Sequence, residues 1–105
     1  MNHLKNEPYC FTFISDPGHG WLEVSYELLA LILVPEALQK ISRHSYQDSE
    51  SKKVYLEEDC DAGIVLASLK EKGIAFKIDE IHCHQASEIR NLDAFCLKEF
   101  EAMLK

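Results

Sequence analysis

The sequence predicts a small α+β domain, in which a mostly antiparallel sheet of three to four strands is combined with about three helices. Short aromatic and β-branched segments alternate with the period of a strand, and other segments repeat with the period of a helix. The two kinds are interleaved without a regular strand–helix–strand rhythm. A chain of 105 residues, 47% of them hydrophobic, can form one core but not two, so residues 1–105 are expected to be a single domain.

The first expected elements are two strands joined by a tight turn. Residues 9–14 alternate between two faces and are rich in aromatic and β-branched types, which is typical of a strand. Asp16-Pro17-Gly18 then forms the turn, because proline fixes φ at the second turn position and glycine accepts a positive φ at the third. Residues 21–24 should resume the extended structure.

A helix and a third strand are expected next. Ser25 can cap a helix over residues 26–34, and Pro35 either ends that helix or begins a short second one. Residues 43–52 are polar and predict a loop, which leads to a strand at residues 53–57.

The strongest helical pattern follows this strand. The helix begins at Asp59 or Asp61 and ends at Gly73, and its apolar residues recur at helical spacing: Ala62, Val65, Leu66 and Leu69. Alternation over residues 74–78 predicts a further strand, and the change of phase at Glu80-Ile81 predicts a bulge or the end of the strand.

Asn91 is expected to cap the last helix. Its apolar face comprises Leu92, Phe95, Cys96, Phe100, Met103 and Leu104.

Composition restricts the classes of partner. The formal charge of −7 repels phosphate, which argues against direct binding to nucleic acid or to anionic lipid and favours a partner protein with a basic surface. The longest apolar run, residues 28–34, is far shorter than the ~20 residues that span a bilayer, so it predicts a core element or a homodimer contact. Four cysteines without a C-x-x-C pair, and no secretory signal, favour free thiols in a reducing cytoplasm.

Four carboxylates lie within five residues in the segment Glu57-Glu58-Asp59-Cys60-Asp61. Such a cluster can cap the following helix, coordinate a divalent cation, supply an acid–base pair or mimic spaced phosphates. Glu57, in phase with Tyr55, is expected to face solvent.

Histidines offer two further candidate sites. His19 lies between two glycines beside Trp21, and Asp16 three residues away could pair with it, although no nucleophile lies in a recognisable elbow. His82 and His84 could supply two metal ligands, but no spacing identifies a third. The sequence therefore predicts no catalytic residue, no metal and no cofactor with any specificity.

Two strings of the sequence resemble a family of small uncharacterised proteins from bacteriophages, prophages and plasmids. They are DPGHGWLEV at residues 16–24 and YLEEDCDA at residues 55–62, with Ile41-Ser42 and Ser45-Tyr46 between them. The likeness covers residues 9–69, somewhat over half of the chain; residues 33–38 replace a shorter helix end, and nothing after about Gly73 matches. The family has no settled activity, but small acidic phage proteins often inhibit host defence or host enzymes by binding them.

These observations predict an inhibitor-type binding protein of a phage or mobile element that acts in the host cytoplasm. Such a counter-defence factor would occlude a basic nucleic-acid-binding surface of a host protein. One acidic and aromatic face is expected to make the contact, composed of Asp16, His19, Trp21, Tyr46, Tyr55, Glu57 and Glu58. The alternative is a small metal-dependent or acid–base hydrolase that uses His19 with Asp16 and the carboxylates of residues 57–61.

Overall fold

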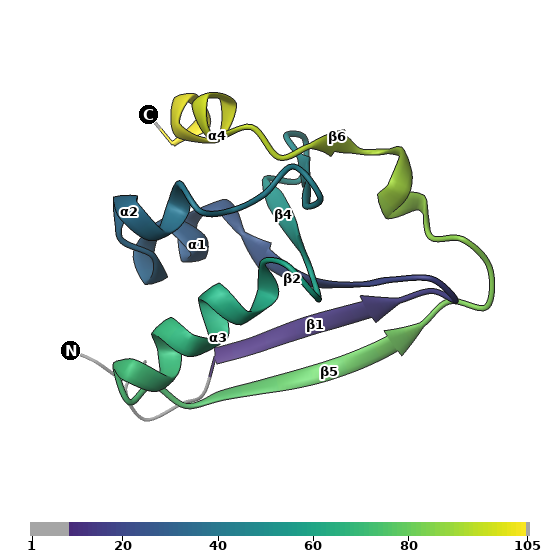
Figure 1. Ribbon diagram of the computed structural model, residues 1–105, viewed down its shortest axis with the longest axis horizontal. Helices are drawn as coiled ribbons and strands as arrows, with labels where there is room; N and C mark the ends of the chain where they lie inside the picture. Colours follow the sequence, from purple (N-terminus) through teal and green to yellow (C-terminus); the bar gives the residue numbers. More distant parts are fainter. Residues whose placement is uncertain (1–8, 105) are drawn as a thin grey trace.

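Six strands form one mixed sheet in the computed structural model, which describes residues 9–104 (Figure 1). The strands are β1 Tyr9–Ser15, β2 Gly20–Ser25, β3 Tyr46–Asp48, β4 Lys53–Glu57, β5 Phe76–His82 and β6 Asp93–Ala94. Their order across the sheet is β5-β1-β2-β4-β3-β6. The pair β1 and β5 is parallel, and all other neighbouring strands are antiparallel.

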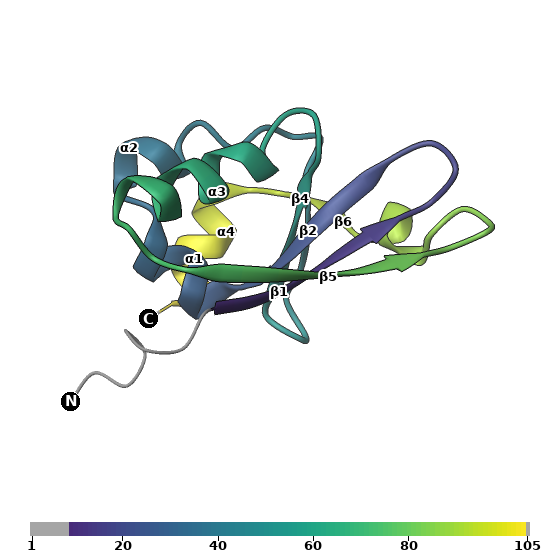
Figure 2. The ribbon, with the colours of Figure 1, turned by 90° about the horizontal axis from the view of Figure 1, so that it is seen from below.

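Helices are gathered mainly on one side of this sheet, and α3 lies over one face of β1 and β5 (Figure 2). The helices are α1 Tyr26–Ile32, α2 Pro35–Leu38, α3 Ala62–Glu71 and α4 Leu97–Met103, with a 3₁₀ helix, η2, at Glu88–Asn91. The Oγ atom of Ser25 accepts a hydrogen bond from the Leu28 amide at 3.1 Å, so the expected cap of α1 is confirmed. Among residues 9–104, no helix combines the length and the apolar character that crossing a bilayer requires.

The α+β class is confirmed, but the expected sheet of three to four mostly antiparallel strands with about three helices is wrong. β3 arises from a polar segment that shows no strand period, and β6 lies inside the segment that was expected to be the last helix. Both form because β4 offers β3 a free edge, and β3 in turn pairs with β6 through Gln47 and Asp93. Pairing between distant segments, not local propensity, produces these strands.

The C-terminal third also differs from the expectation. The last helix begins at Leu97 and not at Asn91, because the Oγ atom of Ser87 caps η2 at Ile89 and the chain is then extended where Phe95 donates its amide to the Ser45 carbonyl at 2.8 Å. Of the bulge or strand end expected at Glu80-Ile81, the bulge is wrong, and the strand ends just beyond these residues, at His82. β5 stays in unbroken register with β1 as far as His82, and the Ile81 side chain is simply 53% exposed.

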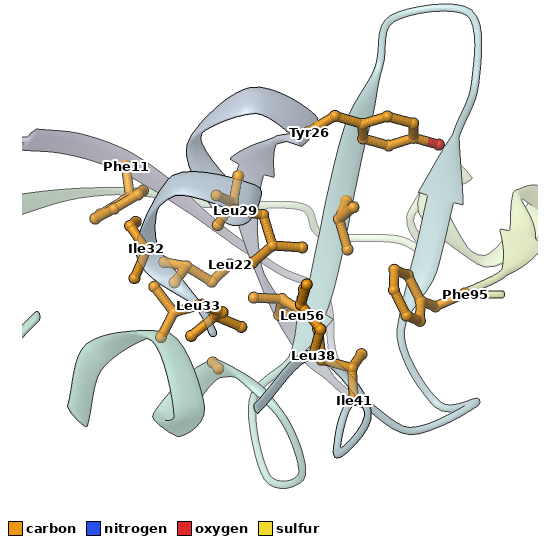
Figure 3. Close-up of a cluster of buried hydrophobic side chains, with 14 of the residues drawn as sticks. Phe11, Leu22, Tyr26, Leu29, Ile32, Leu33, Leu38, Ile41, Leu56 and Phe95 are labelled. Atoms are coloured by element: carbon orange, nitrogen blue, oxygen red, sulfur yellow. The ribbon is translucent and has the colours of Figure 1, made fainter. Parts of the chain in front are cut away.

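The core lies between the sheet and the helices (Figure 3). Its fully buried aliphatic residues come from β2, β4, α1 and α3 and include Leu22, Val54, Leu56, Leu29, Val65 and Leu69. The Phe100 ring of α4 packs edge-on against Tyr26 with the ring centroids 5.1 Å apart. Since side chains alternate along a strand, Trp21 and Glu57 must project from the sheet face opposite to Leu22 and Leu56.

The apolar run at residues 28–34 is divided between the core and the surface. Leu29, Ile32 and Leu33 are buried, whereas Leu31 is 65% and Val34 55% exposed. The homodimer contact expected for this run stays a prediction.

Candidate functional site

The turn between β1 and β2 is organised by the Asp16 side chain. Its Oδ1 atom accepts the amides of Gly18 and His19, each at 3.0 Å, and the Asp16 amide donates to the His19 carbonyl at 2.8 Å. An aspartate that binds the backbone two and three residues ahead fixes such a turn. The turn expected at Asp16-Pro17-Gly18 is therefore confirmed, but the positive φ expected at Gly18 is wrong, because among the glycines of residues 9–104 only Gly73 has one.

Arg90 of η2 completes the surroundings of Asp16. Its Nε and Nη2 atoms donate to the two carboxylate oxygens at 2.7 and 2.8 Å, and the Ser87 amide adds a bond of 2.8 Å. The Arg90 guanidinium, together with these backbone amides, outweighs the effect of burial and holds the pKa of Asp16 far below its usual range. Asp16 is thus an ionised residue that holds the turn and η2 together.

The interpretation of Asp16 and His19 as an acid–base pair is not supported. His19 contacts the Asp16 carboxylate only through its backbone amide, and the imidazole approaches Glu57 instead, with Nδ1 3.4 Å from Oε2. The other Glu57 oxygen accepts the amides of Asp59 and Cys60 at 2.9 and 3.0 Å. Burial raises the pKa of Glu57, but hydrogen bonds from Cys60, His19 and Asp59 outweigh it, and the pKa lies below its usual value.

The two stretches of the expected binding face do meet in space. Trp21 of β2 is in register with Glu57 of β4, and the Glu58 amide donates to the Gly20 carbonyl at 2.9 Å. Tyr46 lies beside Trp21, with their ring centroids 6.3 Å apart, and is in register with Tyr55.

These residues do not all belong to one exposed face. Asp16, Trp21 and Glu57 are buried, with 5%, 1% and 6% exposure, so the expectation that Glu57 faces solvent is wrong. Tyr46 and Tyr55 are half-buried, and burial, with Glu23 beside it, raises the pKa of Tyr55 to about 12. His19 and Glu58 are exposed.

Glu58 lies on the other side of the sheet from Glu57. It lines a hollow together with Phe13 and Leu22, whose side chains face α3. The sequence interpretation treated Glu57 and Glu58 as one unit, but consecutive residues at the end of a strand point in opposite directions.

Asp61 has a role that differs from the expected helix cap. It occupies the cap position of α3, yet its side chain forms no capping bond there. Its carboxylate accepts the Ser42 amide at 3.1 Å, the Ser42 hydroxyl at 2.7 Å and the Ser45 hydroxyl at 2.5 Å. Asp61 therefore ties the loop before β3 to the start of α3.

A small pocket of about 160 Å³ opens where the turn, η2 and the loop before β3 meet. Its lining comprises His19, Trp21, Arg43, His44, Tyr46, Glu57 and Arg90. Four of these belong to the expected face, whereas Arg43, His44 and Arg90 were missed. Arg43 and His44 fell in a segment expected to be a featureless loop, and Arg90 is 74 residues from Asp16.

His82 and His84 stack edge to face with their ring centroids 5.3 Å apart, and His82 Nδ1 is 2.9 Å from the Ser15 hydroxyl. Within the described residues, no three His, Cys, Asp or Glu side chains are grouped closely enough to hold a metal ion.

Comparison with models of protein families, with curated protein sequences and with solved structures finds no match to this chain. The resemblance to phage and plasmid proteins stays a prediction.

Proposed function

We propose that this protein is a non-enzymatic binding protein that docks on a basic partner through a groove between α3 and the strands β1, β2 and β5. The observation that carries the proposal is an apolar groove bordered by two carboxylates that form no ion pair with any residue of the described range 9–104.

The groove has a volume of about 300 Å³. Its apolar surface comes from Phe13, Leu22, Ala62, Leu66 and Ile78, and its carboxylates are Glu58 and Glu80. Gly63 leaves the α3 side open, because a Cβ atom there would meet nothing within 4 Å. Buried apolar area contributes to the affinity of an interface, and charged residues at the rim of the interface determine which partners bind.

Strand β5 borders this groove and forms one edge of the sheet. On this strand, Ile78 lines the groove and is 36% exposed, and the acidic residues Asp79 and Glu80 follow it directly. A basic segment with apolar side chains would match both features.

The charge of the whole chain favours the same class of partner. Asp16 and Arg90 neutralise one another, so the formal charge of −7 is carried by the remaining residues. This field would steer a basic surface toward the protein, and the bound protein would occlude it from nucleic acid in the host cytoplasm.

The hydrolase alternative has less support. Asp16 is held by five hydrogen bonds, which leaves it no role as a base, and within residues 9–104 the His19 imidazole has Glu57 as its only hydrogen-bond partner.

The test is capture of basic proteins from a bacterial lysate on the immobilised protein, with mass spectrometry as the readout. The variant E58K/E80K reverses the charges of the groove, and E36K/E71K makes the same change in net charge at exposed positions outside it. We expect the control to retain the partners of the wild type and the groove variant to lose at least about 90% of them. Capture should also weaken as salt rises. Equal capture by both variants, or capture without basic proteins, would contradict the proposal.

A further inference from the structure

Both arginines of the chain line the small pocket beside Trp21, which lies on the face of the sheet opposite to the groove beside α3. Arg43 and Arg90 are 47 positions apart in a sequence that contains 11 Lys plus Arg, and His19 and His44 join them there. No lysine of the described residues lines this pocket. Arginine differs from lysine in its planar fork of donors, which matches the geometry of phosphate and carboxylate groups.

Arg90 is held in place before any ligand arrives. Its Nε and Nη2 atoms are bonded to Asp16, and its guanidinium carbon lies 5.5 Å from the centre of the Trp21 ring. Because Nε and Nη2 are used by Asp16, the Nη1 group is the donor left for a ligand, and a donor that is fixed in advance loses little conformational entropy on binding.

Arg43 supplies positive charge that is not already compensated, and His44 adds an imidazole beside it. Both side chains are exposed, and within residues 9–104 neither forms an ion pair or a side-chain hydrogen bond. The carboxylate that shares the pocket, Glu57, is bonded to two backbone amides and to His19. These donors partly offset its negative charge.

The size of the pocket limits the ligand. A volume of about 160 Å³ corresponds to roughly five water molecules at ~30 Å³ each and is below the ~300 Å³ at which pockets for drug-sized ligands begin. Trp21, which lines the pocket, also has a buried Nε1–H group without an acceptor in the described structure.

We propose that this pocket binds a phosphate-type oxyanion, with Arg43 as the ligand-contacting cation, His44 as a ligand-contacting imidazole and Arg90 as the fixed donor at its base. The site is separate from the groove beside α3, so either proposal can fail without the other.

Trp21 is the only tryptophan of the chain, so its fluorescence reports on this pocket directly. The experiment is a titration of the wild-type protein with inorganic phosphate at constant ionic strength, with sodium chloride as the blank. We expect a saturable change in fluorescence. The same titration with glycerol 3-phosphate separates two sources of the oxyanion, because a phosphomonoester site would bind it at least as well as free phosphate.

The variants R43Q and H44Q each remove one proposed contact, and K40Q removes one positive charge from an exposed position outside the pocket. We expect R43Q to weaken phosphate binding at least tenfold and K40Q to change it less than twofold. Circular dichroism would verify that the variants are folded. No saturable response of the wild type, or equal loss in R43Q and K40Q, would overturn the proposal.

Discussion

The pair Asp16 and Arg90 shows how far single residues could be predicted. The role of Asp16 in its own turn depends on residues two and three positions ahead, so the local sequence was sufficient to predict it. Its ion pair with Arg90 depends on how the whole chain folds and has no local signal. The sequence predicted an exposed acidic face because it does not show that Arg90 contacts Asp16.

We expect Arg90→Lys to lower the midpoint of thermal unfolding by several degrees, although the charge is kept. A lysine cannot donate to both oxygens of Asp16 or lie flat near the Trp21 ring. Unfolding followed by circular dichroism would measure the change, with Lys98→Gln as an exposed control. An unchanged midpoint for Arg90→Lys would mean that the charge alone, and not the fork, holds the turn.

Two glycines should respond to alanine in opposite directions. A Cβ atom at Gly20 would overlap Phe13 Cζ and come within 2.8 Å of Phe13 Cε2, so Gly20→Ala should destabilise the protein by about 1–3 kcal/mol. Gly63 lies in α3 with no atom within 4 Å of such a Cβ, so Gly63→Ala should stabilise by about 0.5–1 kcal/mol. Urea unfolding of both variants tests the pair, and the same sign for both would contradict it.

At the scale of elements, Asp61 joins the loop before β3 to α3. Asp61→Ala leaves the Ser42 amide and the hydroxyls of Ser42 and Ser45 without their acceptor, so we expect a loss of about 2–3 kcal/mol. Asp59→Ala is the matched control, because Asp59 is exposed and offers only its backbone amide to Glu57. Equal unfolding free energies for the two variants would contradict this role.

Elements with a strong internal period were predictable, and elements that depend on a partner were not. The apolar spacing of α3, the alternation of β1 and the cap of α1 lie within their own segments. β3 and β6 have three and two residues and exist only through pairing. The parallel register of β5 with β1 joins segments more than 60 positions apart, which no local pattern encodes.

For the whole molecule, the sequence suggested that the turn and the carboxylate segment would meet, and they do so in the register of β2 with β4. It did not indicate that η2 covers the place where the turn and the carboxylate segment meet, because η2 comes from the C-terminal third of the chain. η2 buries Asp16 and Trp21 and brings Arg90 to the pocket. The polar surface that was expected to be acidic therefore contains both arginines of the chain.

Carboxylates that are hydrogen-bonded within the protein predict how the stability of the whole molecule changes in acid. Hydrogen bonds from Arg90 to Asp16 and from Ser51 to Asp48 lower the pKa values of these carboxyl groups, and that of Glu57 is lowered as well. A group whose pKa is lower in the folded state adds stability above its unfolded pKa of about 4 and loses it as the pH falls further, because protonation then favours unfolding. We expect the unfolding free energy, measured in urea, to fall steadily from pH 4 to pH 2. The Asp16→Asn variant should be less stable at pH 7, and its unfolding free energy should fall less steeply with pH, because it lacks the carboxyl group whose pKa is lowered most. Parallel declines for the wild type and Asp16→Asn would show that the Arg90 contact does not lower the pKa of Asp16.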